Sequence, residues 1–265
     1  MKPDRILDVA VLAARNAGAV MRESFGRKVE VDAAEHHDIK LRVDKLCETE
    51  ILRTISSSFP RHSFVTEETS RHDPGGDSTW IIDPLDGTVN FAYGVPHFCS
   101  SIAFRDHGAL ACAVIYDPVL DELFHATLGC GAFLNDNPIR VSTRALLEEA
   151  ISSGGFAKSQ RSINEGGRDF LRMAAKLRKI RLTGSAALDM AYVAAGRFDA
   201  YLERDMSIWD IAAGTLLIRE AGGRVAVREI SDNAQHYNVL GTNALIHDKL
   251  ASFLNIDLSS GKDVL

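Results

Sequence analysis

The sequence has few cysteines and no long apolar run, and each absence excludes a class of protein. Neither a zinc site nor a disulfide framework is indicated, because no Cys-x-x-Cys pair occurs among the four scattered cysteines, Cys47, Cys99, Cys112 and Cys130. No segment is apolar over the length needed to cross a bilayer, and the first residues lack the continuous apolar core of a signal peptide. We therefore expect a protein of the reducing cytoplasm that does not associate with membranes.

Runs of lysine or arginine are also absent, and the formal net charge is −6. A nucleic-acid surface needs a basic stripe or patch, so we expect no direct binding to nucleic acid. The most positive stretch, residues 168–179, lies in a helical pattern and is interpreted as a solvated helix face. A hydrophobic content of 46% with 25% charged residues is ordinary for a globular protein, and 265 residues can bury a substantial core.

Apolar periodicity predicts helices mixed with strands and no internal repeat. Residues recurring at three- and four-residue steps predict helices near 4–25, 44–59, 170–177, 185–195, 207–221 and 245–254, with a weak one at 145–149. Short apolar runs predict strands at 29–31, 63–66, 80–83, 99–104, 109–116, 123–126, 129–134, 198–202, 224–230 and 239–240. The strands between 99 and 134 are expected to form an antiparallel meander, Ser185 to cap its helix, and residues 152–155 to break the chain.

One stretch, residues 80–91, combines the parts of a metal site and a phosphate site. Its apolar run ends in Asp83, and Asp86 follows three positions later, just before Gly87 and Thr88. Two carboxylates at the end of a strand suit a hard cation such as Mg²⁺, which takes oxygen ligands. The Gly-Thr pair offers backbone N–H groups and a hydroxyl to an oxyanion. The pattern indicates metal-assisted chemistry on a phosphate.

Three further acids lie at the ends of predicted elements. Glu67 follows the strand at 63–66, while Asp44 and Asp210 fall in the first turns of helices. Each has a plain structural explanation, because Glu67 can open a polar loop and an acid in a first helical turn complements the helix dipole. Strand ends that meet at one crevice are nevertheless where open sheets build their sites. The three acids are therefore candidates to join the carboxylates of residues 80–91.

Three motifs in order along the chain carry a resemblance to a known family. They are Val65-Thr66-Glu67-Glu68-Thr69, Asp83-Pro84-Leu85-Asp86-Gly87-Thr88-Val89-Asn90-Phe91 and Trp209-Asp210-Ile211-Ala212-Ala213-Gly214. Together with the run from Gly184 to Met190, they resemble the inositol monophosphatase family over nearly the whole chain. The resemblance implies a mixed α/β fold, layered α-β-α-β-α as in sugar phosphatases. It also implies a homodimer of one unit, which family members often divide into two packed halves, here at about residue 140.

The resemblance further implies an Mg²⁺-dependent, Li⁺-sensitive phosphomonoesterase with two or three Mg²⁺ ions per subunit. The metal ligands would be Glu67, Asp83, the backbone carbonyl of Leu85, Asp86 and Asp210. Phosphate would bind the backbone N–H groups of Gly87 and Thr88, and the attacking water would be oriented by Thr88, Glu67 and Asp44. The substrate would contact Asp86, Gly184, Ser185, Ala186 and Glu203. The phosphate residues and all metal ligands except Asp210 fall in the first half, about 1–140, and most substrate contacts fall in the second, about 141–265.

Two segments depart from the family pattern. The lysine that the family carries in a mobile loop before Asp44 has Ala33 at its position here, so its role is not carried over, and the adjacent His36 and His37 are interpreted as loop, not as a metal site. The run from Glu203 to Met206 is more charged than in typical inositol phosphatases. Its Arg204 either faces solvent or pairs with a second phosphate of the substrate.

The expected reaction is the hydrolysis of inositol 1-phosphate to inositol and phosphate by a metal-activated water, without a phosphoenzyme. Fructose 1,6-bisphosphate, histidinol phosphate and other sugar phosphates are alternative substrates. A 3′-phosphoadenosine phosphate is disfavoured, because nucleotide-specific relatives usually place a charged residue where Val89 follows Thr88. An alternative of another class is a regulatory interaction protein on the same scaffold, since some bacterial relatives are thought to contact the transcription machinery.

Overall fold

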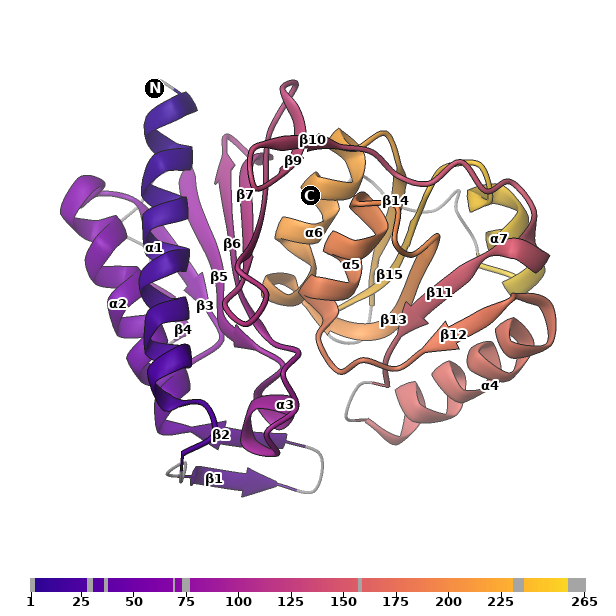
Figure 1. Ribbon diagram of the computed structural model, residues 1–265, viewed down its shortest axis with the longest axis horizontal. Helices are drawn as coiled ribbons and strands as arrows, with labels where there is room; N and C mark the ends of the chain where they lie inside the picture. The colour runs from indigo at the N-terminus through magenta and orange to yellow at the C-terminus, as the bar shows by residue number, and fades with distance from the viewer. Residues whose placement is uncertain are drawn as a thin grey trace.

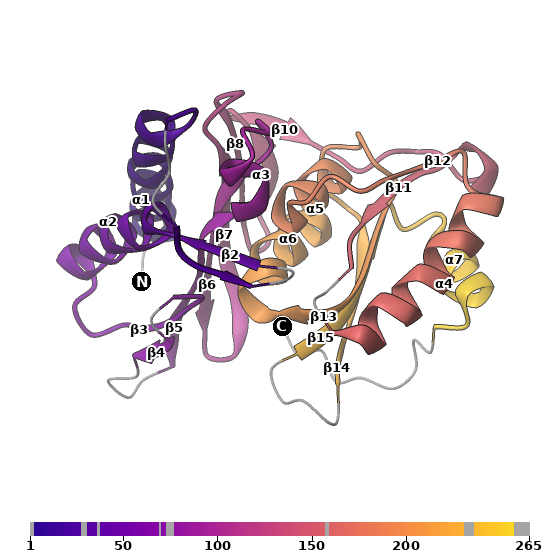
Figure 2. The ribbon, with the colours of Figure 1, turned by 90° about the horizontal axis from the view of Figure 1, so that it is seen from below.

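The computed structural model describes residues 3–27, 31–35, 38–68, 70–72, 77–156, 159–230 and 236–256. These residues stack in five layers, in which pairs of helices alternate with an eight-stranded and a five-stranded sheet (Figure 1). The same order is visible after a quarter turn (Figure 2). The layered, mixed α/β architecture expected from the sequence is confirmed. Within the described residues, no helix is long and apolar enough to span a membrane.

The first layer is a helix pair packed on the larger sheet. Small buried residues such as Ala13 and Ala17 form the inner face of the longer helix, whose predicted extent is confirmed to within a residue. A Cβ atom at Gly18 would lie 2.4 Å from a ring carbon of Tyr116, so this helix approaches the sheet closely. The two helices are α1 (Pro3–Ser24) and α2 (Arg42–Ser58).

The larger sheet follows the order β10-β9-β8-β7-β6-β5-β3-β4. Its neighbouring strands are antiparallel except for β3 and β5, which run parallel, so the predicted meander is confirmed. Ile81 faces the central helices while Trp80 and Ile82 face α1 and α2, and burial of both faces explains the continuous apolar runs. The strands are β3 (Ser63–Thr66), β4 (Ser70–His72), β5 (Ser78–Asp86), β6 (Cys99–Asp106), β7 (Ala109–Asp117), β8 (Glu122–Thr127), β9 (Gly131–Leu134) and β10 (Asn137–Ile139).

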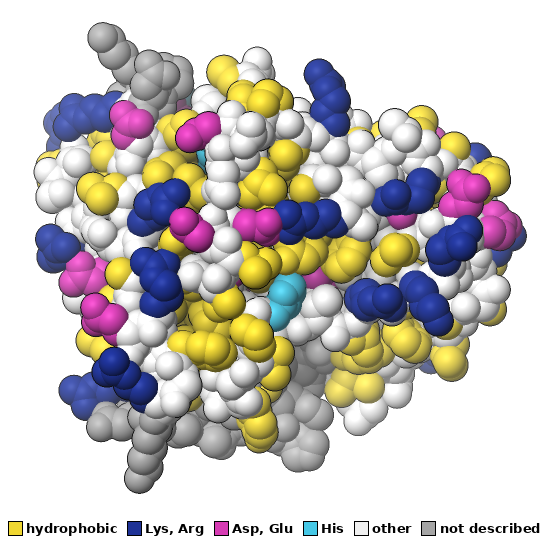
Figure 3. Space-filling view, viewed as in Figure 1, with side chains coloured by type: hydrophobic (Ala, Val, Ile, Leu, Met, Phe, Trp, Pro, Cys, Tyr) yellow, Lys and Arg dark blue, Asp and Glu magenta, His cyan; other side chains and the backbone are white. Residues whose placement is uncertain are grey.

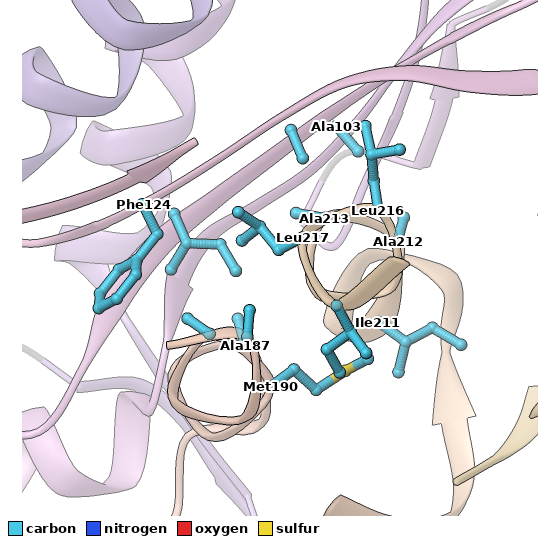
Figure 4. Packing of buried hydrophobic residues seen from close by; sticks show 14 of the residues in the cluster. Ala103, Phe124, Ala187, Met190, Ile211, Ala212, Ala213, Leu216 and Leu217 are labelled. Atoms are coloured by element: carbon cyan, nitrogen blue, oxygen red, sulfur yellow. The ribbon is translucent and has the colours of Figure 1, made fainter. Parts of the chain in front are cut away.

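The central layer consists of α5 (Ala186–Ala194) and α6 (Ile208–Glu220), and its core joins the two sheets. Figure 4 shows Ala187, Ala212 and Ala213 among larger aliphatic side chains between the elements. Small residues let the helices pack tightly, since a Cβ atom at Gly214 would lie 2.5 Å from the Cβ of Met190. Each fully buried leucine or isoleucine here stabilises the fold by roughly 1.5–3 kcal/mol.

The smaller sheet has the order β12-β11-β13-β15-β14, with α4 (Gln160–Lys176) and α7 (His247–Leu254) on its outer face. The prediction of a break at residues 152–155 is wrong, because residues 151–154 form a strand, and a strand at 179–181 was not predicted. Ser152 and Ser153 are buried, and a Cβ atom at Gly154 would lie 2.1 Å from the carbonyl oxygen of Leu202. Close packing therefore requires small residues here. Because these residues do not form an apolar run, the sequence did not predict a strand. The strands are β11 (Ile151–Gly154), β12 (Lys179–Arg181), β13 (Ala200–Ser207), β14 (Arg224–Glu229) and β15 (His236–Thr242).

Short elements complete the chain. The weak helix expected at 145–149 is a single 3₁₀ turn, η1 (Leu147–Glu149), and α3 (Thr88–Ala92) follows β5. A separate antiparallel pair, β1 (Val31–Glu35) and β2 (Asp38–Leu41), precedes α2. Of the strand predicted at 29–31, only Val31 lies within the described residues, and it belongs to β1. His36, His37 and Thr69 lie outside the described residues. The sheets derive from residues 63–139 and 151–242, but a division into two halves stays a prediction.

Charge is mixed on the face of the molecule shown in Figure 3. Basic and acidic side chains are interspersed across this view. Within the basic stretch at 168–179, Arg172 is not simply solvated, because its guanidinium donates to the backbone carbonyls of Phe253 and Leu254. It thereby joins α4 to α7.

Candidate active site

The candidate site begins where β5 ends. Asp83 is only 2% exposed, and its Oδ1 accepts a hydrogen bond of 3.1 Å from the backbone N–H of Leu85. Gly87 has φ +93°, and a Cβ atom there would lie 2.9 Å from the carbonyl oxygen of His97, so the turn requires glycine on both counts. Thr88 then starts α3, and its hydroxyl donates to the Leu85 carbonyl at 2.9 Å. The turn thus presents a carboxylate, a carbonyl and a hydroxyl within six residues.

Parallel pairing brings Glu67 to the same edge of the sheet. Thr66 on β3 is paired with Ile82 on β5, so Glu67, which follows β3, comes next to Asp83, which lies within β5. This register is the convergence of strand ends that the sequence suggested.

Asp44 joins this turn from the N-terminus of α2. Its Oδ2 accepts from the backbone N–H of Leu41 at 2.7 Å, and its Oδ1 lies 3.5 Å from the Thr88 hydroxyl oxygen. Burial raises the pKa of Asp44 to about 8, and the charges of Glu67 and Glu68 add to the rise. The residue therefore completes the first turn of its helix and also contacts the candidate site.

Asp86 ties the turn to the central layer. It accepts hydrogen bonds from the Ser185 hydroxyl and from the backbone N–H groups of Ala187, at 2.8 Å, and Ala186, at 3.3 Å. Burial raises its pKa, and these hydrogen bonds oppose the rise. Ser185 stands at the N-cap position of α5, but the prediction that its side chain caps the helix is wrong, because the hydroxyl bonds Asp86 instead.

Asp210 reaches the site from the first turn of α6. Its Oδ2 accepts from the backbone N–H of Ser207 at 2.8 Å, in a capping box. Burial raises the pKa of Asp210 well above its usual range, followed by the charges of Glu67 and Asp86. Both sequence interpretations therefore hold, since the residue stabilises its helix end and lies among the other acids.

The charges of the acids raise one another's pKa values. The pKa of Asp83 is raised first by burial and then by the charges of Glu67, Asp86, Asp210 and Asp44. Two like charges about 4 Å apart cost roughly 4 kcal/mol at an effective dielectric constant of about 20. A hard dication would offset this repulsion, and carboxylates with the Leu85 carbonyl are the oxygen donors it prefers, so the donor set fits Mg²⁺.

The donors are spread around the site instead of being gathered at one point. Among the described residues, no three histidine, cysteine, aspartate or glutamate side chains already converge on a single ion position. The donor chemistry therefore supports a metal site, whereas the number of ions does not follow from the side-chain positions.

Glu203 forms the opposite wall. The Tyr201 hydroxyl donates to its Oε2 at 2.7 Å, and a Cβ atom at Gly155 would lie 2.6 Å from its Oε1. Burial raises the pKa of Glu203 to about 7. The close approach of β11 thus explains why two glycines occur at residues 154–155.

A cavity of about 560 Å³ connects these walls. Seven of the predicted site residues line it, namely Glu67, Asp86, Gly184, Ser185, Ala186, Glu203 and Asp210. The other five lie behind this lining, joined to each other by the hydrogen bonds and the turn described above: Asp44, Asp83, Leu85, Gly87 and Thr88.

Several lining residues were not predicted as site residues, although two belong to quoted motifs. They are Phe156, Ser159, Asp189, Asp205, Met206, Ser207, Trp209 and His236. Asp189 lies in the run from Gly184 to Met190, and Trp209 lies in the last motif. Membership in these motifs was the only sequence feature that could have indicated them as site residues. Arg204 neither faces solvent nor the cavity, because its guanidinium pairs with Asp169 at 2.7 Å and Glu165 at 3.5 Å on α4.

Comparison with known proteins agrees with this arrangement, because residues 2–254 match the model of the inositol monophosphatase family. The chain belongs to the inositol monophosphatase family. It is 45% identical over 229 residues to a Salmonella typhimurium protein named Nus factor SuhB, covering 83% of this chain and 84% of the relative. Membership supports a phosphatase, in a family that is Mg²⁺-dependent in general.

Solved structures of the family share the fold. The extragenic suppressor protein SuhB of Bartonella henselae superposes with a TM-score of 0.88 at 36% identity, covering 94% of this chain and 98% of its own. An inositol monophosphatase from Anabaena has a TM-score of 0.84 at 36% identity, covering 98% and 99%. The family resemblance inferred from the three motifs is confirmed.

Proposed function

We propose that the protein is an Mg²⁺-dependent phosphomonoester hydrolase whose preferred substrate is inositol 1-phosphate. The observation that carries the proposal is the set of four acids from three separate parts of the chain, Glu67, Asp83, Asp86 and Asp210, three of which line one cavity. Gathering buried like charges is costly for a fold, and metal binding is the ordinary reason that such a group persists.

In this proposal the donors divide into two sets. Glu67, Asp83 and the Leu85 carbonyl hold a first Mg²⁺, while Asp83, Asp86 and Asp210 hold a second, and Glu67 contributes to a weaker third site. When bound, the metal supplies an activated water and offsets the charge on the phosphate. The hydrogen bonds from Ser185 and from the N-terminus of α5 fix the orientation of Asp86 for this role.

Thr88 orients the attacking water in this proposal. Its hydroxyl proton is directed to the Leu85 carbonyl at 2.9 Å, so its oxygen remains able to accept a hydrogen bond from water. Glu67 and Asp44 complete the water position, and the backbone N–H groups of Gly87 and Thr88 bind the phosphate. Because Thr88 positions water and does not itself attack, we expect in-line hydrolysis without a phosphoenzyme.

The alcohol of the substrate lies against the wall of the cavity that Glu203 forms. Glu203 lies beside Gly155 and accepts a hydrogen bond from Tyr201 through Oε2, and a carboxylate has further acceptor capacity for a substrate hydroxyl. Asp86 and the segment from Gly184 to Ala186 line the same cavity and supply further contacts. A polyol with several hydroxyls, such as inositol, matches this wall. Fructose 1,6-bisphosphate, histidinol phosphate and other sugar phosphates are alternative substrates.

A panel of phosphomonoesters tests the proposal. We expect phosphate release that requires Mg²⁺, falls with Li⁺ and is fastest with inositol 1-phosphate. Asp83→Asn should abolish it, whereas Asp248→Asn should not, since Asp248 is a surface partner of Arg224. Equal release in the presence of a chelator, or a phosphate covalently trapped on the chain, would contradict the proposed mechanism.

A second candidate is a regulatory interaction role on the same scaffold, as the name Nus factor borne by curated relatives suggests. The retained acids weigh against a loss of catalysis but not against a second role. Release of phosphate that disappears in Asp83→Asn would separate an enzyme from a pure interaction protein. We also propose a cytoplasmic homodimer, which light scattering after size-exclusion chromatography would test.

A further inference from the structure

An irregularity in β13 places an acid in the wall of the cavity. The pairing of β13 with β15 shifts register between Glu203 and Met206, so Arg204 and Asp205 form a bulge. Bulges next to active sites redirect side chains. Arg204 turns outward to α4, whereas Asp205 lines the cavity.

Asp205 adopts a backbone conformation that is unusual for a residue with a side chain. Its φ is +64°, in the left-handed region that glycine, asparagine and aspartate tolerate best. Such residues persist where their surroundings fix them, and they cluster at functional sites. The conformation therefore suggests that the position of this carboxylate matters.

Two side chains hold the carboxylate of Asp205, and a third holds its backbone. The Ser159 hydroxyl, at the N-cap of α4, donates to its Oδ2 at 2.8 Å, and Nδ1 of His236, at the start of β15, lies 2.9 Å from its Oδ1. Its backbone N–H is directed to Oδ1 of Asn238 at 3.2 Å. The side chain remains 20% exposed, so it is fixed in position and still accessible from the cavity.

The charge of the cavity wall has one sign. Among the described residues that line it, six are aspartate or glutamate, one is histidine and none is lysine or arginine. Glu67, Asp86 and Asp210 belong to the proposed metal site, where bound cations would offset their charge. Asp205 lies outside that set and, with Glu203, faces the part of the cavity left for the alcohol of the substrate.

We propose that Asp205, held by Ser159 and His236, is a specificity-determining residue that disfavours substrates with a second phosphate. The cavity then selects monoesters whose alcohol is uncharged or cationic, because a second phosphate would meet a fixed carboxylate with no described lysine or arginine to offset the repulsion. Hydroxyl or ammonium groups can instead donate to Asp205. This inference rests on the proposed hydrolase function.

The test compares fructose 1-phosphate with fructose 1,6-bisphosphate, which differ by one phosphate. For each, kcat/KM is measured in the presence of Mg²⁺ for the wild type, Asp205→Asn and Asp205→Gly. Both substitutions remove the charge and tolerate a positive φ. We expect the ratio of monophosphate to bisphosphate efficiency to fall about tenfold in both variants. The control Asp248→Asn, which makes the same charge change outside the cavity, should leave the ratio unaltered.

The outcomes are distinguishable. An unchanged ratio in both variants would overturn the inference. A fall of the ratio in Asp205→Gly alone would also overturn it, because the preference would then depend on the space in the cavity and not on charge. If either result is found while the same preparations still hydrolyse inositol 1-phosphate, the proposed hydrolase function holds and only the role of Asp205 is refuted. A wild type that hydrolyses none of the esters would overturn both proposals together.

Discussion

The two sheets contribute to the site in different ways. The larger sheet ends in a tight turn where Asp83 is buried between core residues and Gly87 is required by sterics. The smaller sheet contributes Glu203 and Asp205 around a bulge, where side chains from α4 and β15 fix the positions. In the first region the core itself sets the geometry, and in the second a few polar contacts do. We therefore expect the larger-sheet side to carry the chemistry and the smaller-sheet side to set the choice of substrate.

The largest expected effect is on turnover when a metal ligand of the proposed site is changed. Asp210→Asn should lower kcat/KM for inositol 1-phosphate by about a hundred- to a thousandfold, because the loss of one charge-stabilising group costs about 10²–10³. The asparagine oxygen can still accept from the Ser207 N–H, so α6 should keep its cap. The measurement is phosphate release, with circular dichroism to show an intact fold. Activity within tenfold of the wild type would refute this role.

Metal should stabilise the protein through the larger-sheet region. At a free Mg²⁺ concentration of about 100 times Kd, linkage predicts a gain of about 2.7 kcal/mol, or roughly 5–10 °C in Tm for a chain of this size. Asp83→Asn should lose most of this shift, whereas Asp205→Asn should keep it, since only Asp83 is a proposed ligand. Melting curves with Mg²⁺ and with a chelator measure both. Identical curves for the wild type would argue against an assembled site.

Substitution of a glycine in the turn should cost stability for two reasons. Gly87→Ala places a Cβ atom 2.9 Å from a carbonyl oxygen at φ +93°, so we expect a loss of about 2–3 kcal/mol. Gly26→Ala is the matched control, because Gly26 also has positive φ, +74°, but a Cβ atom there meets nothing within 4 Å. That variant should lose only about 1 kcal/mol. Urea titrations measure both, and equal losses would show that the steric contact is unimportant.

The smallest effect concerns the outer face of the smaller sheet, where His247 is 2% exposed and lies 2.8 Å from the Thr242 hydroxyl. Burial lowers the pKa of His247 to about 4. The unfolded chain therefore binds more protons than the folded one between pH 6.5 and about 4, and stability falls as pH falls through that window. Between pH 7 and pH 6 the loss should be about 1 kcal/mol. His247→Gln should reduce the difference between urea midpoints at the two pH values, and an unchanged difference would refute the assignment.

Much of the larger-sheet region could be predicted from the sequence. Strands such as those around Trp80 and Ile102 are buried on both faces and therefore read as continuous apolar runs, and the amphipathic α1 has a clear period. The smaller sheet was harder. Residues 151–154 form a strand that contains two serines and a glycine. Close packing against the neighbouring strand selects these small residues, so the strand has no apolar run by which it could be predicted.

The candidate site shows the same contrast. Acids in motifs, such as Asp83 and Asp210, could be predicted as site residues because the sequence indicates where the strands and helices end. Ser159 and His236 could not, since they reach the cavity only through the packing of α4 and β15 around a bulge. Arg204 was misread because its partner Asp169 lies 35 residues away on a different element.

The central pair of helices has a consequence for any attempt to divide the chain. Helices α5 and α6 come from the second half of the sequence, yet their alanine-rich surfaces cover Ile81, Ala103 and Ala113 of the first. A fragment ending near residue 140 would leave that sheet face bare to water. We expect such a fragment to aggregate when expressed alone and to be recovered in soluble form only when the remainder is co-produced.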